Sequence, residues 1–129
     1  MTHLPEAIST KDAPQAIGPY SQAIACGNLL FLSGQIPLDP ATMQIVGSTV
    51  EAQTERVLKN IEGVLKARNL GFKNIIKTTV FLKNMGDFPK FNETYQKAFE
   101  PPFPARSTVE VARLPKDVLV EIESIAFIA

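Results

Sequence analysis

The sequence predicts an α+β domain in which two amphipathic helices cover one face of a sheet of about six strands. Runs of apolar and β-branched residues, bounded by glycine, proline and asparagine, predict the strands. Two segments in the middle of the chain repeat their apolar residues at helical spacing instead. We expect strands over residues 4–10, 21–26, 29–33, 74–83, 105–112 and 118–128. Because no linker or repeat interrupts this order, we expect a single domain over residues 1–129.

The first predicted helix follows a capping motif and ends near a glycine. Ser48 and Glu51 match the S-x-x-E pattern that caps a helix N-terminus. Apolar residues then recur at helical spacing, namely Val57, Ile61, Val64 and Leu65. Gly71 is placed to stop the helix, because glycine readily adopts the left-handed conformation found at helix C-termini.

The second predicted helix starts near Asp87 and carries a row of aromatic side chains. Pro89 fits its first turn, where no intrahelical N–H donor is required. The aromatic row consists of Phe88, Phe91, Tyr95 and Phe99. Such a row fits a ligand surface or the core, and packing against the sheet is the favoured interpretation. Pro101 and Pro102 end the helix.

Composition and charge exclude several classes of function. Thirteen Lys and Arg residues balance thirteen Asp and Glu residues, so no net field attracts nucleic acid or anionic lipid. No apolar run approaches the roughly 18 residues of a membrane span. The N-terminal residues lack both the apolar core of a signal peptide and the arginine-rich pattern of a presequence. We therefore expect no membrane partner, and nucleic acid is a disfavoured partner.

The single cysteine and the single histidine remove most familiar catalytic arrangements. Cys26 is the only cysteine, so no internal disulfide forms and a reducing compartment is expected. His3 is the only histidine, which leaves no Ser-His or Cys-His pair and no histidine-based metal cluster. No glycine-rich phosphate loop is present either. We expect a cytoplasmic protein, with the mitochondrial matrix as the alternative.

The last predicted strand is apolar on both of its sides. Side chains alternate across a strand, so Val120 and Ile122 take one side while Ile125 and Phe127 take the other. Only one side can rest on the helices of the same chain. The other side is expected to pack against another subunit, which predicts a homo-oligomer.

The last quarter of the chain also carries two charges among apolar residues, and buried charges need partners. Arg106 stands at the entry of one strand with Thr108 on the same face, and its planar guanidinium fits a carboxylate. Glu121 lies in the following strand, where burial would raise its pKa and suit it to handle a water or a substrate nitrogen. An ion pair of Arg106 with Glu110, Glu121 or Glu123 explains the same charges equally well.

Two further candidates stand near strand ends. Tyr20 follows the rigid Gly18-Pro19 corner, which presents a phenol to a ligand or plugs the end of the sheet. Gly34 ends a buried strand, where it admits a ligand close to a free N–H or merely turns the chain. Together the residues predict an oligomeric α+β domain with an arginine–carboxylate site and no metal, nucleotide or covalent nucleophile.

Six motifs follow one another along nearly the whole chain. They are residues 17–23 (IGPYSQA), 33–37 (SGQIP), 76–82 (IKTTVFL), 91–95 (FNETY), 104–107 (PARS) and 121–123 (EIE). In this combination the chain closely resembles the reactive-intermediate deaminase A family, also called RidA, YjgF or L-PSP. The resemblance implies a chorismate-mutase-like fold with a mixed sheet, and a homotrimer with active sites between subunits. It also implies hydrolysis of 2-imino and enamino acids, such as 2-iminobutanoate and 2-iminopropanoate, to 2-keto acids and ammonia without a cofactor.

The same resemblance implies a role for each candidate residue. Arg106 would clamp the substrate carboxylate, and the backbone N–H groups near Gly34 and Thr108 would support its oxygens. Glu121 would position or activate the attacking water, and Tyr20 would line and orient the site. Thr108 departs from the family pattern, because many members carry cysteine after P-A-R-S. A backbone role would tolerate this change and is the expected one, whereas a thiol role would shift substrate preference.

Two other functions stay open at the level of sequence. RNA-cleaving inhibition of translation is also attributed to family members, although the balanced charge and the lack of a basic aromatic patch argue against it. The same cleft would also suit a non-catalytic module that binds small carboxylates. No motif in the chain specifies the preferred imino acid.

Overall fold

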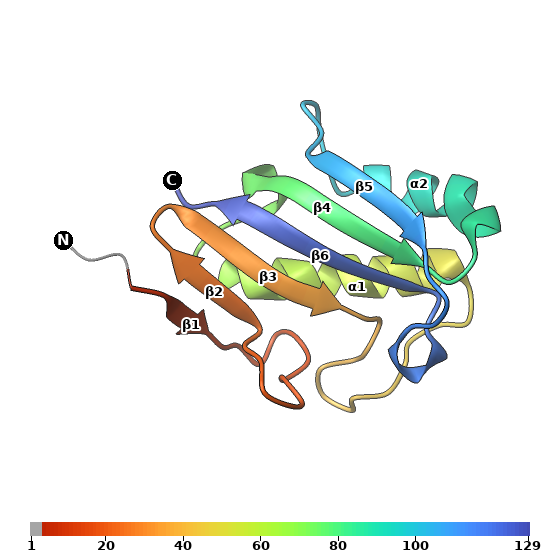
Figure 1. Ribbon diagram of the computed structural model, residues 1–129, viewed down its shortest axis with the longest axis horizontal. Coiled ribbons are helices and arrows are strands. Elements are labelled where there is room, and N and C mark those ends of the chain that lie inside the picture. Colours follow the sequence, from red (N-terminus) through yellow and green to blue (C-terminus); the bar gives the residue numbers. More distant parts are fainter. Residues whose placement is uncertain (1–3) are drawn as a thin grey trace.

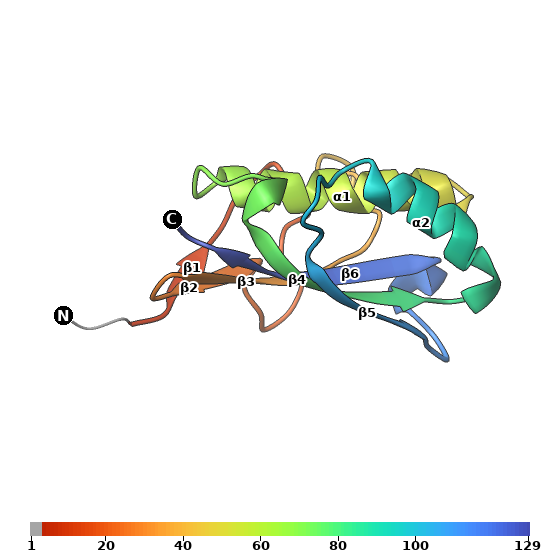
Figure 2. The same cartoon turned by 90° about the horizontal axis from the view of Figure 1, so that it is seen from above.

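The protein is one sheet with both long helices on the same face (Figures 1 and 2). The computed structural model describes residues 4–129. Its strands are β1 (Glu6–Ile8), β2 (Ala23–Cys26), β3 (Leu29–Gln35), β4 (Ile75–Leu82), β5 (Ala105–Glu110) and β6 (Val120–Phe127). Its helices are α1 (Val50–Lys66) and α2 (Phe88–Gln96), with short 3-10 turns η1 (Phe72–Asn74), η2 (Met85–Asp87) and η3 (Pro115–Asp117). The six-stranded sheet under two helices confirms the predicted α+β fold.

The two C-terminal strands are not neighbours in the sheet. The order is β1-β2-β3-β6-β4-β5, and β4 and β5 run parallel while the other neighbours are antiparallel. On β4, Thr78 pairs with Arg106 of β5, and Phe81 pairs with Glu121 of β6. Residues 111–119, which connect β5 to β6 and contain η3, therefore pass the end of β4 (Figure 1).

The ends of α1 differ from the predicted ones. The N-cap is Thr49 and not Ser48, because the Thr49 hydroxyl accepts a hydrogen bond from the Ala52 N–H at 3.2 Å. At the other end, Asn69 has a φ of 59°, whereas Gly71 has a φ of −138°. Asparagine tolerates the left-handed conformation, so the chain turns before it reaches the predicted glycine stop.

The aromatic row belongs to the core, as predicted. The predicted end of the second helix is wrong, however, because α2 stops at Gln96, so Phe99 lies beyond it and Pro101 and Pro102 do not end it. Phe91 is fully buried and Tyr95 is 4% exposed. The Tyr95 ring centroid lies 5.3 Å from that of Phe91 and 4.7 Å from that of Phe99. The predicted inner residues of α1 are buried as well, namely Val57, Ile61, Val64 and Leu65. Both helices thus pack their apolar sides on one face of the sheet.

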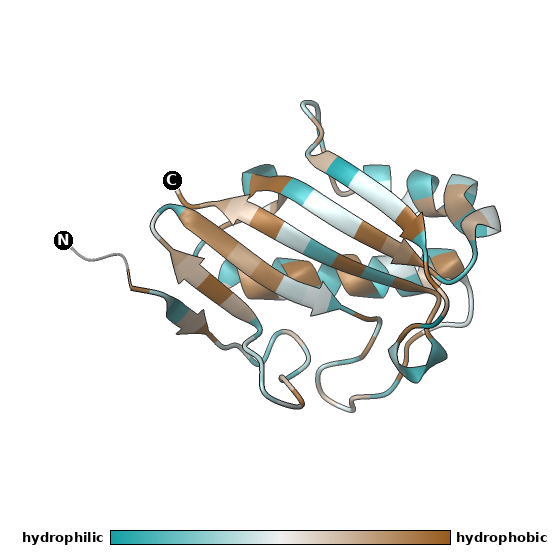
Figure 3. Ribbon diagram, in the orientation of Figure 1, coloured by the Kyte–Doolittle hydropathy of each residue, from teal (hydrophilic) through white to brown (hydrophobic). Residues whose placement is uncertain are grey.

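The other face of the sheet is open and partly apolar. On β6, Ile122 and Ala126 face the helices and are fully buried, whereas Glu121 and Phe127 face away. Four large apolar side chains are between 42% and 47% exposed on the strands, namely Phe31, Ile76, Val109 and Phe127. Brown bands mark apolar residues across the strands in Figure 3. No helix within residues 4–129 is long and apolar enough to cross a membrane.

Helix α1 also holds the loop that follows β1. Gly63 lies on the buried side of α1, directly against the backbone carbonyl group of Asp12. A Cβ atom at position 63 would overlap the Asp12 oxygen. The absent side chain therefore allows the loop and the helix to approach closely.

Replacing Gly63 by alanine is expected to destabilise the protein, although alanine is the better helix former by about 1 kcal/mol. The methyl group would displace the loop around Asp12, and overpacking of this kind costs about 1–3 kcal/mol. Chemical denaturation measures the free energy of unfolding. Glu55→Ala, on the exposed side of α1, is the control and should change it by less than about 0.5 kcal/mol. A Gly63→Ala variant more stable than the wild type would contradict the close approach.

Candidate active site in two halves

A cavity of about 560 Å³ lies where β3 ends beside the start of β6. Its walls come from three segments, within residues 14–22, 33–38 and 115–123. Tyr20, Gly34 and Glu121 line it together. The fold thus brings a phenol, a backbone without a side chain and a carboxylate to one place from three distant parts of the chain.

Glu121 stands in this cavity as a half-buried carboxylate that has no hydrogen-bond or salt-bridge partner among residues 4–129. Burial raises the pKa of Glu121, and the negative charge of Glu123 raises this pKa further. Glu121 takes no part in the salt bridges formed within residues 4–129. A Cβ atom at Gly34 would overlap the Glu121 carboxylate. Gly34 therefore makes room for the acid, a role that sequence reasoning did not assign to it.

Tyr20 is held at the rim of the same cavity. Gly18, with a φ of 119°, takes a conformation that favours glycine, and its carbonyl oxygen accepts from the Tyr20 N–H at 2.9 Å. The Tyr20 hydroxyl accepts from the Ile17 N–H at 3.4 Å, which leaves the hydroxyl proton available to a ligand. Because Tyr20 is 52% exposed, the geometry fits a presented phenol better than an aromatic plug.

Buried amide side chains fix the walls of this cavity, and Gln22 holds the first wall. Its NH2 group donates to the Pro14 carbonyl oxygen at 2.8 Å. Its own carbonyl oxygen accepts from the Thr10 N–H at 2.7 Å. Gln22 is 4% exposed, and breaking such a bond away from water leaves a costly unpaired group. The loop that carries Pro14 to the cavity is therefore firmly held.

Two amides from α1 hold the other walls. The Asn60 NH2 group donates to the carbonyl oxygens of Ile36 at 3.1 Å and Leu38 at 2.9 Å, and both of these residues line the cavity. The Gln53 carbonyl oxygen accepts from the Leu119 N–H at 2.7 Å, just before β6. Neither amide was predicted as part of the site. The available signal was a polar residue at positions 53 and 60 on the buried side of α1.

Arg106 lies on the opposite face of the sheet, against the aromatic rings of α2. Its guanidinium carbon stands 5.0 Å from the ring centroid of Tyr95, 5.4 Å from that of Phe88 and 5.8 Å from that of Phe91. Cation–π attraction at these distances stabilises an arginine without a carboxylate. Burial raises the pKa of Tyr95, partly offset by its hydrogen bond to Thr78 and by the Arg106 charge. The ring beneath Arg106 therefore stays neutral.

The alternative in which a glutamate pairs with Arg106 is wrong. The salt bridges within residues 4–129 join Glu62 with Lys66, Glu6 with Arg68 and Asp117 with Arg113. Glu110 accepts a hydrogen bond from the Met85 N–H at 2.8 Å instead, and Glu121 and Glu123 lie on the open face. The donor groups of Arg106 consequently stay free for a ligand.

A second cavity, of about 390 Å³, opens beside Arg106 and is lined in part by Asn92, Tyr95 and Pro104. The Asn92 Oδ1 atom and the Thr108 Oγ1 atom are buried without a hydrogen-bond partner among the described residues. Unpartnered buried polar atoms are rare in proteins, and here they accompany a free guanidinium. Asn92 and Tyr95 were not predicted as site residues, because the aromatic row by itself indicates core packing.

One chain does not bring Arg106 and Glu121 into the same cavity. Their pairing partners on β4, Thr78 and Phe81, are three positions apart, which is about 10 Å along a strand. Thr78 is buried under the helices, so Arg106 beside it faces the helices, whereas Glu121 faces the open side. The predicted residues form two groups, the acid half-site (Tyr20, Gly34, Glu121) and the arginine half-site (Arg106, Thr108).

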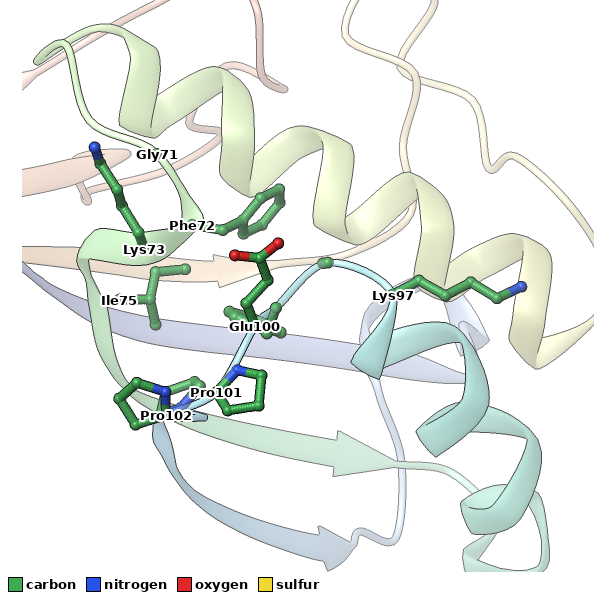
Figure 4. A pocket seen from close by; sticks show the side chains of 11 residues that line it. Gly71, Phe72, Lys73, Ile75, Lys97, Glu100, Pro101 and Pro102 are labelled. Carbon is green, nitrogen blue, oxygen red and sulfur yellow. The ribbon is translucent and has the colours of Figure 1, made fainter.

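A further cavity, of about 490 Å³, lies between η1 and the segment after α2 (Figure 4). Lys73 and Lys97 extend from opposite sides of it, and Pro101 and Pro102 line its edge. None of the predicted site residues lines this cavity. Within residues 4–129, no group of three or more His, Cys, Asp or Glu side chains is placed to hold a metal ion.

Known proteins resemble this chain over nearly its full length. The Endoribonuclease L-PSP family model matches residues 10–128. A RutC family protein of Pyrococcus horikoshii is 54% identical over 122 residues, which cover 95% of this chain and 97% of the relative. The chloroplastic Reactive Intermediate Deaminase A of Arabidopsis thaliana is 50% identical over 121 residues, which cover 94% of this chain and 65% of the relative.

A solved structure shows the same fold. The crystal structure of TdcF from E. coli, which contains bound serine, matches with a TM-score of 0.91 and 43% sequence identity. The match covers 96% of this chain and 99% of TdcF. With the family model and two close relatives in agreement, the chain belongs to the L-PSP family of reactive-intermediate deaminase (RidA) proteins.

Proposed function

We propose that the protein is an imine deaminase that hydrolyses 2-imino acids, such as 2-iminobutanoate and 2-iminopropanoate, to 2-keto acids and ammonia. The observation that carries this proposal is the guanidinium of Arg106, which is held by aromatic rings and forms no salt bridge with a carboxylate in the described part of the chain. Its free donor edge fits a carboxylate, a group present on every 2-imino acid. Two relatives support the choice, since one is named a reactive intermediate deaminase and TdcF binds serine.

The acid half-site supplies the chemistry in this proposal. The substrate reacts as the protonated imine, C=NH2+. The Glu121 carboxylate takes a proton from water as the water oxygen bonds to C2, while the C=N electron pair moves to the cationic nitrogen and leaves a neutral NH2 group. Glu121 returns the proton to the amino nitrogen, and ammonia leaves with the C–N electron pair. The Glu121 carboxylate takes up the hydroxyl proton as the C=O bond forms, and it then loses this proton to solvent. A raised pKa suits Glu121 to these transfers. The Tyr20 hydroxyl donates to the reacting group and orients it.

We further propose that the complete site forms between subunits of a homotrimer. Arg106 and Glu121 leave opposite faces of one sheet, so a single chain cannot apply both to one small substrate. The open face carries exposed apolar side chains that a neighbouring subunit would cover. In this arrangement the acid half-site of one subunit meets the arginine half-site of the next. The balanced charge and single cysteine fit the cytoplasm, with the mitochondrial matrix as the alternative.

RNA cleavage is the second candidate function, favoured by the description of the matching family model. The balanced charge argues against it, since binding to nucleic acid rests on clustered cations. Incubation with labelled single-stranded RNA should give no cleavage above buffer. A small-carboxylate-binding module would instead bind a 2-keto acid without any turnover of the imine.

Replacing Arg106 by alanine is expected to lower kcat/KM for a 2-imino acid by about 100-fold or more, because truncating one partner of a buried charge pair costs 2–5 kcal/mol. The imino acid is generated in situ by an amino-acid oxidase, and release of the 2-keto acid is followed. Arg113→Ala removes an exposed ion pair and should keep wild-type activity. An active Arg106→Ala variant would rule out the carboxylate clamp, and a wild type no faster than buffer would refute the deaminase.

Replacing Glu121 by glutamine is expected to abolish hydrolysis and to flatten the pH dependence of stability. The pKa of Glu121 is higher in the folded protein than in the unfolded chain. Protonation of Glu121 therefore contributes fully to the free energy of unfolding below the pKa that Glu121 has in the unfolded chain, and this contribution is lost as the pH rises through its pKa in the folded protein. The free energy of unfolding of Glu121→Gln should therefore fall less than that of the wild type from about pH 4 to about pH 7. Urea titrations at each pH measure the free energy of unfolding of the variant and of the wild type, with the exposed Glu55→Gln as control. Release of the 2-keto acid measures hydrolysis. Parallel curves for Glu121→Gln and the wild type would contradict this assignment.

The proposed trimer is expected to scatter light as a particle of three 14.1 kDa chains. Phe31→Glu puts a charge on the open face, so it should shift the protein to smaller particles and remove activity. Leu4→Glu changes an apolar residue that is 75% exposed and lies outside the strands, so it should keep both properties. A wild-type particle of 14.1 kDa at micromolar concentration would overturn the trimer.

A further inference from the structure

The rings of Phe88, Phe91 and Tyr95 form an aromatic cradle around Arg106. We propose that Tyr95, locked to the sheet by Thr78, is a positioning residue that holds the Arg106 guanidinium in its ligand-binding direction. Tyr95 acts through Arg106 and need not touch the substrate. The inference rests on the proposed function and extends it to a residue that the aromatic pattern assigns only to the core.

Tyr95 differs from the two phenylalanine rings because its hydroxyl group forms a hydrogen bond to the sheet. Its hydroxyl stands 2.8 Å from the Thr78 Oγ1 atom, and either atom can donate the hydrogen bond. Thr78 is 1% exposed and Tyr95 is 4% exposed, so water does not compete for this bond. The bond fixes the direction of the ring as well as its position.

Thr78 is also the residue that pairs with Arg106 across the β4–β5 ladder. The Thr78 side chain, which is hydrogen-bonded to Tyr95, and the Arg106 side chain therefore start from adjacent positions on the same face of the sheet. Tyr95 reaches this pair from α2, and its ring centroid is the nearest of the three to the Arg106 guanidinium, at 5.0 Å. One hydrogen bond thus links α2, β4 and the ring on which Arg106 rests.

The aromatic cradle has a consequence that a carboxylate partner would not have. A carboxylate would occupy the N–H donors of the guanidinium, whereas a ring face attracts the charge without using a donor. An arginine held before the ligand arrives also avoids most of the ordering cost that a flexible side chain meets on binding. Tyr95 therefore strengthens carboxylate binding while it leaves the donor edge of Arg106 free.

Binding of 2-oxobutanoate, a non-reacting 2-keto acid, tests the role of the ring. Tyr95→Leu removes the ring and is expected to raise the Kd, measured by calorimetry, about 10-fold. The KM for the imino acid should rise by a similar factor with kcat nearly unchanged, because the carboxylate is held equally in the ground state and the transition state. A merely structural defect would instead lower the active fraction and so kcat.

The hydrogen-bond lock is tested by Tyr95→Phe and Thr78→Val. Tyr95→Phe keeps the ring and should recover most of the affinity lost in Tyr95→Leu, with a Kd within about 3-fold of the wild type. Because both substitutions remove the same bond, the double variant should show no larger effect than either single one. Additive effects would overturn the lock. These two variants decide the question if Tyr95→Leu does not fold.

Phe99→Leu is the matched control. Phe99 belongs to the same aromatic row and packs against the Tyr95 ring with centroids 4.7 Å apart, but it is not one of the rings around Arg106. Its loss should lower the melting temperature as Tyr95→Leu does, and leave the Kd and the KM unchanged. Equal effects of both variants on the Kd would overturn the proposal. If the wild type hydrolyses imines and Tyr95→Leu binds 2-oxobutanoate with the wild-type Kd, only the inference about Tyr95 is overturned. If the wild type is inactive and binds no 2-keto acid, the proposed function is overturned as well.

Discussion

The candidate site depends on the separation of an arginine from an acid. If Arg106 and Glu121 lay side by side on one face, they would form an ion pair, and neither would be free for a ligand. The sheet prevents this, because β4 lies between their strands and the two side chains leave opposite faces. A protonated 2-imino acid carries both a carboxylate and a cationic nitrogen. In the proposed assembly, the substrate meets two complementary charges that have not already neutralised each other.

Keeping two charges half-buried and unpaired is unfavourable for folding, and the surrounding structure limits that cost in different ways. Arg106 rests on ring faces, which attract its charge without consuming its donors. Glu121 has no such partner, and its raised pKa records the remaining penalty. The buried amides of Gln22, Gln53 and Asn60 hold the loops around it with satisfied hydrogen bonds. The walls of the acid half-site are therefore set before a substrate arrives, as binding and catalysis require.

Local pattern in the sequence is sufficient for the elements but not for their ends. The aromatic row predicts a helix and its buried side from spacing alone, and the structure agrees over Phe88–Gln96, whereas Phe99 lies beyond the helix end. At the start of α1, however, Ser48 and Thr49 both carry a capping hydroxyl, and only the path of the chain selects Thr49. At the end of α1, Asn69 takes the turn that glycine was expected to take. Where two nearby residues can each cap a helix or take the left-handed turn, tertiary structure decides which of them does so. A local sequence pattern does not contain that information.

Pairing between distant strands is the other information that a single sequence lacks. Alternation along a strand predicts that Arg106 and Thr108 share a face, but not that this face lies under α2. That result follows from the parallel register with β4, which places Arg106 beside buried Thr78. The same register explains why the proposed pairing of Arg106 with Glu121 or Glu123 fails, since these acids face the open side. The residues could be named from sequence, whereas their division into two half-sites could not.

The burial of the Thr108 hydroxyl beside Arg106 favours a role for this hydroxyl in binding. The hydroxyl is buried without a partner among the described residues, and an unpaired buried hydroxyl is more costly than a thiol, which behaves as a small apolar group. In the isolated chain threonine is thus less favourable than the cysteine that the resemblance to the family implies at this position. The cost is offset once a ligand oxygen or a neighbouring subunit supplies the missing partner. In the proposed site, a substrate carboxylate held by Arg106 would bring such an oxygen, so threonine at position 108 is compatible with the proposed chemistry.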